Sequence, residues 1–272
     1  MKLSVALCTY NGSRYIEKQL LSIINQTIVP DEIIICDDRS SDNTVQIIEN
    51  FIKTHPDINI KIFINESSLR TIKNFEKAVS LCSGDWLFLS DQDDMWKKNK
   101  VEKMLNFIAQ NSETLLLFTD GQLVDENDSN LESSLWEKWK FNPEIRKKWL
   151  NNENAFEDLV HNKNYVTGAT VMISRKLLKD TLPFDIPKGY YHDCWLAVNA
   201  AGLNGLRYMN ECLIDYRIHQ QQQVGITSGG NDISNIMIET NISQKQYIKK
   251  LYRKYTPKKL NLFQRLISNL YK

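Results

Sequence analysis

The residues best suited to chemistry form three polar clusters, each directly after a run of apolar residues. They read Thr-Tyr-Asn-Gly at 9–12, Asp-Asp-Arg-Ser at 37–40 and Ser-Asp-Gln-Asp-Asp at 90–94. Because the carboxyl ends of parallel strands meet at one edge of a sheet, we expect the three clusters to line one crevice. Several Asp side chains in one crevice repel each other unless a cation or a hydrogen-bond donor compensates. A divalent metal ion is the simplest compensator.

Carboxylate oxygens suit Mg²⁺ or Mn²⁺, and Mg²⁺ is commonly held by one or two carboxylates with substrate phosphates completing its shell. A nucleoside diphosphate is therefore indicated as the ligand. The sequence has no GxxxxGK[ST] loop and no GxGxxG after its first apolar run, so phosphate has to be held by metal. A structural alternative is that Asp38 and Asp42 cap the helix after residue 42, and that Asp94 caps the helix around residue 101.

The elements that must position these clusters can be predicted from apolar periodicity. Strands are expected at 3–8, 33–36, 59–64, 86–89 and 115–118, separated by amphipathic helical patterns. This alternation predicts an α/β fold with a doubly wound, mostly parallel sheet. From 120 to 163 only short helices and loops can be assigned. Later elements are strands at 170–174, 206–209 and 213–218, a helix at 194–201 and a mobile loop at 220–235.

Composition indicates an ordinary globular protein, with 272 residues, 42% hydrophobic and 25% charged. These values exclude collagen-like and wholly disordered chains. Five Cys without a CxxC pair argue against a disulfide framework and a structural zinc site. No apolar run approaches the roughly 18 residues of a membrane span, and the apolar part of the N-terminus is too short for a secretory signal. We therefore expect a cytoplasmic protein.

The net charge of +1 conceals a basic tail. Residues 240–272 carry nine Lys or Arg and no Asp or Glu, which leaves 25 basic against 33 acidic residues in the first 239. A nucleic-acid partner is therefore not expected. Apolar residues such as Tyr247, Leu251 and Leu266 recur in the tail, and basic amphipathic segments of this kind lie on anionic leaflets. The alternatives are packing on the catalytic domain or on a second subunit.

The three clusters resemble those of the family 2 glycosyltransferases, which have the GT-A fold. Three later segments extend the resemblance to a bacterial rhamnosyltransferase-like subgroup: Gly168-Ala169-Thr170, His192-Asp193-Cys194-Trp195 and Tyr216-Arg217-Ile218-His219. The resemblance implies a GT-A domain over 1–225. Residues 1–120 would form its nucleotide-sugar-binding half and 121–225 its acceptor and catalytic half. Residues 226–272 would form a loop and the basic amphipathic tail.

The resemblance also implies a role for each matching donor-side residue. One of Asp37 and Asp38 would contact the base or ribose of the donor, and Thr9 would line the same pocket. Asp91 would contact the ribose or the metal. Asp93 would hold the Mn²⁺ or Mg²⁺ that bridges the diphosphate and neutralises the departing nucleoside diphosphate.

On the acceptor side, Asp193 matches the general base that deprotonates the acceptor hydroxyl. Its structural alternative is the N-cap of the following helix. His219 matches a histidine that completes the metal shell or contacts the phosphates. The pair Leu69-Arg70 stands where relatives commonly carry a Gly. The side chain of Arg70 would reach either the donor's base or phosphate or only the surface.

The resemblance therefore implies an inverting hexosyltransferase that uses dTDP-rhamnose or a UDP-hexose. The expected acceptor is a hydroxyl of a lipid-linked surface glycan, with the enzyme cytoplasmic and peripheral on the inner face of the membrane. One alternative is a metal-dependent nucleotidyltransferase, although the Gly-rich basic first loop of that class is missing. Another is a non-catalytic glycan- or membrane-binding relative, against which the presence of Asp91, Asp93 and Asp193 argues.

Overall fold

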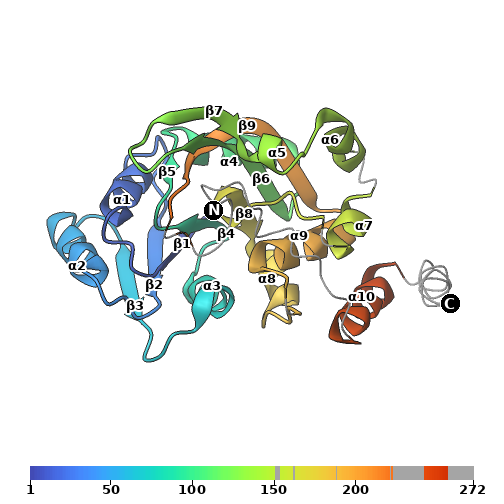
Figure 1. The fold of residues 1–272 in the computed structure, drawn as a ribbon, viewed down its shortest axis with the longest axis horizontal. Helices are drawn as coiled ribbons and strands as arrows, with labels where there is room; N and C mark the ends of the chain where they lie inside the picture. Colours follow the sequence, from blue (N-terminus) through green and yellow to red (C-terminus); the bar gives the residue numbers. More distant parts are fainter. Residues whose placement is uncertain (151–153, 162, 188, 221, 223–241, 257–272) are drawn as a thin grey trace.

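A computed structural model describes residues 1–150, 154–161, 163–187, 189–220, 222 and 242–256. Within these residues, nine strands form one sheet in the order β3-β2-β1-β4-β8-β6-β9-β5, with β7 paired to β6 (Figure 1). In this part of the chain no helix is long and apolar enough to cross a membrane.

The strands are β1 (Leu3–Thr9), β2 (Glu32–Asp37), β3 (Ile60–Ile64), β4 (Trp86–Asp91), β5 (Met95–Trp96), β6 (Leu116–Val124), β7 (Asn130–Ser134), β8 (Val171–Ser174) and β9 (Leu206–Arg217). The helices are α1 (Ile16–Ile24), α2 (Thr44–Thr54), α3 (Arg70–Leu81), α4 (Lys100–Gln110), α5 (Leu135–Lys138), α6 (Pro143–Leu150), α7 (Ala155–Val160), the 3₁₀ turn η1 (Gly168–Thr170), α8 (Arg175–Thr181), α9 (His192–Gly202) and α10 (Ile242–Tyr255).

The first half of the sheet is parallel, as the alternating pattern predicts. β1 pairs in parallel with β2 and β4, and β2 with β3. Every residue of β1 and β2 is buried, which suits strands covered on both faces. α3 covers β1 and β2 and buries Phe75, Ala78 and Val79. The predicted α/β class is confirmed.

The second half is mixed in direction. β8 lies antiparallel between β4 and β6, and β9 lies parallel to β6. β6 continues to Val124 and forms a hairpin with β7, so the expectation of only helices and loops from 120 to 163 is wrong. The expected strands at 206–209 and 213–218 are one strand, β9, whose pairing with β6 shifts register near Asp120.

The described part of the basic tail, α10, packs on the domain. Its apolar side buries Tyr247, Leu251 and Tyr252, and the Tyr247 ring contacts Tyr190 and Trp195. This is the packing alternative foreseen for the tail. The remaining expected tail residues, 257–272, and the expected loop from 223 to 235 lie outside the described residues.

Candidate active site

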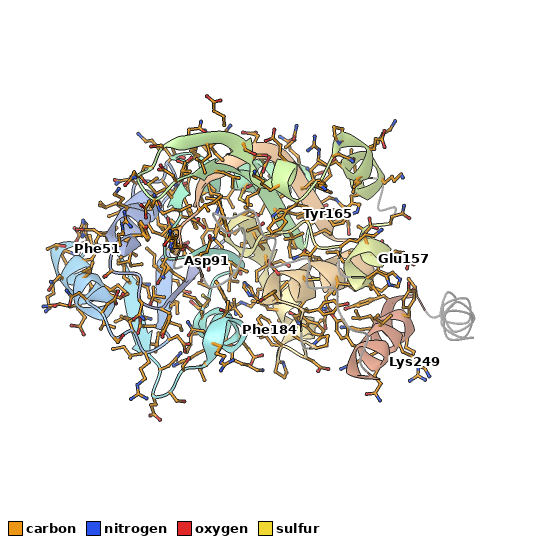
Figure 2. All side chains as sticks on the ribbon, in the orientation of Figure 1. Phe51, Asp91, Glu157, Tyr165, Phe184 and Lys249 are labelled. Carbon is orange, nitrogen blue, oxygen red and sulfur yellow. The ribbon has the colours of Figure 1, made fainter. Side chains whose placement is uncertain are left out.

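A pocket opens where β1 and β4 end, beside the first turn of α9. Figure 2 shows Asp91 at this edge of the sheet, well away from Lys249 on α10. The pocket is lined by Cys8, Thr9, Tyr10, Asp38, Thr71, Asn74, Phe75, Asp91, Gln92, Asp93, Thr167, Gly168, Tyr191, His192, Asp193, Tyr216 and Gln222. The structure therefore brings Thr9, Asp38, Asp91, Asp93 and Asp193 together from four segments of the chain.

The lining is strongly acidic. Four Asp carboxyl groups line the pocket, and no Lys or Arg is among the described residues that do so. Burial is the main reason why the pKa of Asp91 is raised to about 8, and the negative charges of Asp93 and Asp193 add to the increase. No described residue donates a hydrogen bond to the Asp91 carboxylate. A pocket of this kind favours a cationic ligand, or an anionic ligand that arrives with a cation.

Asp93 is held by two residues at the end of β9. His219 Nε2 lies 2.8 Å from Asp93 Oδ2, and the Arg217 Nε–H donates to the Asp93 carbonyl at 2.8 Å. Arg217 is fully buried and also pairs with Asp128 at 2.5 Å. His219 thus contacts Asp93, a residue of the acidic cluster after β4, but it lies outside the pocket lining.

The residues present fit a hard divalent cation only together with phosphate. Among the described residues, no group of three or more His, Cys, Asp or Glu is arranged to hold a metal ion by itself. Asp91 and Asp93 nevertheless present carboxylate oxygens to the pocket, and those of Asp91 lack a hydrogen-bond donor. Mg²⁺ and Mn²⁺ are commonly held by such a carboxylate set, with phosphate oxygens supplying the remaining ligands.

Asp193 lies in the first turn of α9 and faces the same pocket. The residue before this helix is Tyr191, so Asp193 is not its N-cap. Its Oδ1 accepts hydrogen bonds from the Cys194 N–H at 2.6 Å and from the Asn164 amide at 3.3 Å. Burial raises the pKa of Asp193 to about 6, despite these bonds. A carboxylate with a pKa near 6 is ionised at neutral pH and still basic enough to accept a proton.

The acidic pair at the end of β2 accepts hydrogen bonds from several residues. Asp37 is fully buried and accepts from Thr9 Oγ1, Ser40 Oγ and the Ser40 N–H, and it lies outside the pocket lining. Asp38 accepts from four donors, namely Asn65 Nδ2, Ser68 Oγ and the N–H groups of Leu69 and Arg70. Burial alone would raise the pKa of Asp38, but these bonds hold it below its ordinary value.

The structural alternatives for three Asp residues have different outcomes. Asp42 accepts the Thr44 N–H, at 3.0 Å, at the start of α2, although the N-cap of this helix is Asn43. Asp38 instead accepts the N–H groups of Leu69 and Arg70 at the start of α3, because the chain after β3 returns over the end of β2. Asp94 does not cap α4, which begins at Lys100 after Asn99. It is buried and accepts the Arg217 N–H at 3.1 Å.

The backbone of Arg70 has an unusual conformation and a defined hydrogen bond. It has a left-handed φ of 60° at the start of α3, a conformation that favours Gly, and its N–H binds Asp38. Its side chain is not among those lining the pocket. The conformation gives a physical reason for a Gly at this position that is independent of any ligand.

Other lining residues were not foreseen as site residues. Phe75 stacks on His192 with ring centroids 4.0 Å apart, and neither nitrogen of this buried His has a hydrogen-bond partner. Gln92 and Tyr216 also line the pocket. The position of Gln92 between two motif Asp residues is a usable signal, whereas nothing in the sequence relates Phe75 to His192.

The chain is similar to known glycosyltransferases. Residues 4–182 match the family model described as Glycosyl transferase family 2. The Bacillus subtilis protein TuaG, named as a teichuronic acid biosynthesis glycosyltransferase, is 30% identical over 216 residues, covering 79% of this chain and 78% of TuaG. The dTDP-rhamnosyl transferase RfbG of Shigella flexneri is 34% identical over 176 residues, covering 56% of this chain and 61% of RfbG.

Solved structures share the fold. S. aureus TarS 1–349 in complex with UDP-GlcNAc has a TM-score of 0.64 at 18% identity, covering 94% of this chain and 68% of that fragment. The mannosyltransferase PcManGT of Pyrobaculum calidifontis, in complex with GDP-Man and Mn²⁺, has a TM-score of 0.53 at 17% identity, covering 78% of this chain and 55% of PcManGT. The fold is therefore GT-A, and the chain belongs to glycosyl transferase family 2.

Proposed function

We propose that the protein transfers a sugar from a nucleoside-diphosphate donor to a hydroxyl acceptor, with inversion at the anomeric carbon. The observation that carries the proposal is the pocket lined by four Asp, with no Lys or Arg among the lining residues that the structure describes. A diphosphate cannot enter such a pocket without a compensating cation. The pocket also holds a separate, buried carboxylate, Asp193, with a pKa suited to proton acceptance.

Asp91 and Asp93 would hold the cation, Mn²⁺ or Mg²⁺, together with the diphosphate oxygens. When bound, the ion supplies charge neutralisation for the leaving nucleoside diphosphate. His219 fixes the carboxylate of Asp93, and Arg217 fixes its carbonyl, so this ligand is oriented before the donor arrives. Thr9 and Tyr10 would form the donor-side wall of the pocket.

Asp193 would act as the general base. The acceptor hydroxyl gives its proton to the Asp193 carboxylate as its oxygen bonds to the anomeric carbon, and the bond from that carbon to the diphosphate breaks. The Cys194 N–H and the Asn164 amide hold Oδ1. One displacement of this kind inverts the configuration.

The names of relatives suggest the substrate class. TuaG is named for teichuronic acid biosynthesis and RfbG as a dTDP-rhamnosyl transferase, while TarS and PcManGT bind UDP-GlcNAc and GDP-Man in their structures. For this chain we propose dTDP-rhamnose or a UDP-hexose as donor, within a rhamnosyltransferase-like subgroup, and a lipid-linked surface glycan as acceptor. The exposed basic residues Lys250 and Arg253 on α10 suit a cytoplasmic enzyme bound to the inner face of the membrane.

The test is calorimetric binding of UDP, dTDP, GDP and CDP, each with and without Mn²⁺. We expect one base to bind, in a strictly Mn²⁺-dependent manner, and Asp93→Asn to abolish that binding. Asp57→Asn, on the exposed surface, is the matched control and should bind as the wild type does. If none of the four nucleotides binds the wild type with Mn²⁺, the proposed function is wrong.

A further inference from the structure

Gln92 makes a contact that none of the roles above explains. It stands between Asp91 and Asp93 in the turn that follows β4, here called the acidic turn (residues 91–94). Its side-chain amide accepts from the Tyr10 N–H at 2.7 Å and donates to the Tyr10 carbonyl at 2.9 Å. One side chain thus satisfies both backbone groups of Tyr10, which also lines the pocket and follows the neighbouring strand β1.

The neighbouring glycine leaves room for this contact. A Cβ on Gly12 would lie 2.2 Å from Gln92 Oε1 and 2.3 Å from Gln92 Cδ, so the amide occupies the space that any other residue at position 12 would fill. The loop of residues 10–12 also forms hydrogen bonds with residues that follow β2. The Asn11 N–H donates to Ser40 Oγ, and the Gly12 N–H donates to Oγ1 of Thr44, the first residue of α2. Gln92 adds the acidic turn to this set of connected loops.

We propose that Gln92 is a positioning residue that clamps the loop of residues 10–12 to the acidic turn and so fixes the spacing between these two neighbouring segments of the donor pocket. The inference rests on the proposed function, because the ligand that would contact both segments is the nucleoside diphosphate with its cation. An amide is the required chemistry, since it offers one acceptor and one donor to the two backbone groups and adds no charge between two carboxylates. A pocket whose segments already have the spacing that the ligand requires loses less conformational entropy when the ligand binds.

The experiment is a double-mutant cycle at Gln92 and Gly12, read by calorimetry with Mn²⁺ and whichever of UDP or dTDP binds the wild type. We expect Gln92→Ala to raise the Kd about tenfold, equivalent to about 1.4 kcal/mol. Gly12→Ala displaces only the flexible end of Gln92 and should raise the Kd to the same extent. In the Gln92→Ala background, Gly12→Ala should have no further effect, because the clamp is already lost.

Two readouts separate positioning from general destabilisation. The unfolding midpoints of all three variants should stay at the wild-type value, while the Mn²⁺ concentration needed for half-maximal nucleotide binding rises. Gln110→Ala, at the exposed end of α4, is the matched control and should change neither. Wild-type affinity in Gln92→Ala, or additive effects of the two substitutions, would overturn the clamp. Absence of nucleotide binding by the wild type would instead overturn the proposed function.

Discussion

Replacing Asp193 by Asn should make the protein more stable and inactive at the same time. Burial raises the pKa of Asp193 from 3.8 to about 6, so the ionised form is disfavoured in the folded state relative to the unfolded chain. At about 1.36 kcal/mol per pKa unit, the cost at neutral pH is up to about 3 kcal/mol. Asn retains an oxygen that can accept from the Cys194 N–H and the Asn164 amide, and it carries no charge.

The sign of the effect depends on pH. Below about pH 4 the carboxyl is protonated in both states, so Asp193 costs nothing and the variant should match the wild type. Between about pH 4 and 6 the folded state retains a proton that the unfolded chain has lost, and the stability contributed by that proton decreases as pH rises. Above about pH 6 both states are ionised and the full cost remains. The stabilisation by Asp193→Asn should therefore appear between pH 4 and 6 and persist above it.

The assay is thermal unfolding of wild type and Asp193→Asn from pH 4 to 8, in EDTA so that no metal ion contributes. At roughly 2–4 °C per kcal/mol for a chain of this size, the variant should melt up to roughly 6–12 °C higher at pH 7.5 and at the wild-type temperature at pH 4. Asp57→Asn, at an exposed position, should melt with the wild type throughout. An Asp193→Asn variant with no pH-dependent gain, or with sugar transfer intact, would refute the reasoning.

Three further predictions concern the same pocket. The transfer rate should rise with pH through about 6 and then level off, because Asp193 must be ionised. Asn164→Ala should move the midpoint of this rise upward, because the Asn164 hydrogen bond lowers the pKa of Asp193. A rate independent of pH from 5 to 7 would contradict the base role. Arg70→Gly should raise the free energy of unfolding by about 1 kcal/mol in urea titrations, because Gly adopts the left-handed φ without strain, whereas Arg70→Ala should not. A UDP-hexuronate should compete for the donor site at least about tenfold more weakly than the matching UDP-hexose, because its carboxylate enters an acidic pocket, and equal competition would contradict that electrostatic argument.

The part of the site that the sequence predicts consists of residues at the ends of parallel strands. Thr9 and Asp91 follow apolar runs whose parallel pairing is implied by the alternating pattern, and β1 and β4 do lie side by side. The acidic pair after β2 shows the limit of this reasoning. Asp37 and Asp38 look alike in the sequence, but the donors to Asp38 are residues 65–70, which lie 27 to 32 residues further along the chain, beyond α2 and β3.

The second half was less predictable because long-range contacts determine it. The stretch from 120 to 163 has no regular apolar period, yet its aromatic residues pack around one another, with Phe141 in contact with Phe118, Trp136 and Trp149. β9 reads as two strands because its pairing with β6 is irregular near Asp120. The apolar side of α10 was visible in the sequence, whereas its burial against Tyr190 and Trp195 follows only from the fold.

The position of β8 has a consequence for how the chain folds during synthesis. β4 pairs with β8 through Trp86 and Ser174, and β6 pairs with β8 through Leu116 and Ile173. Until residues 171–174 have left the ribosome, β4 and β6 each keep an open edge of unpaired backbone groups. Such edges readily recruit strands from other molecules. We therefore expect a fragment ending at residue 120 to aggregate, although it contains every element of the parallel half.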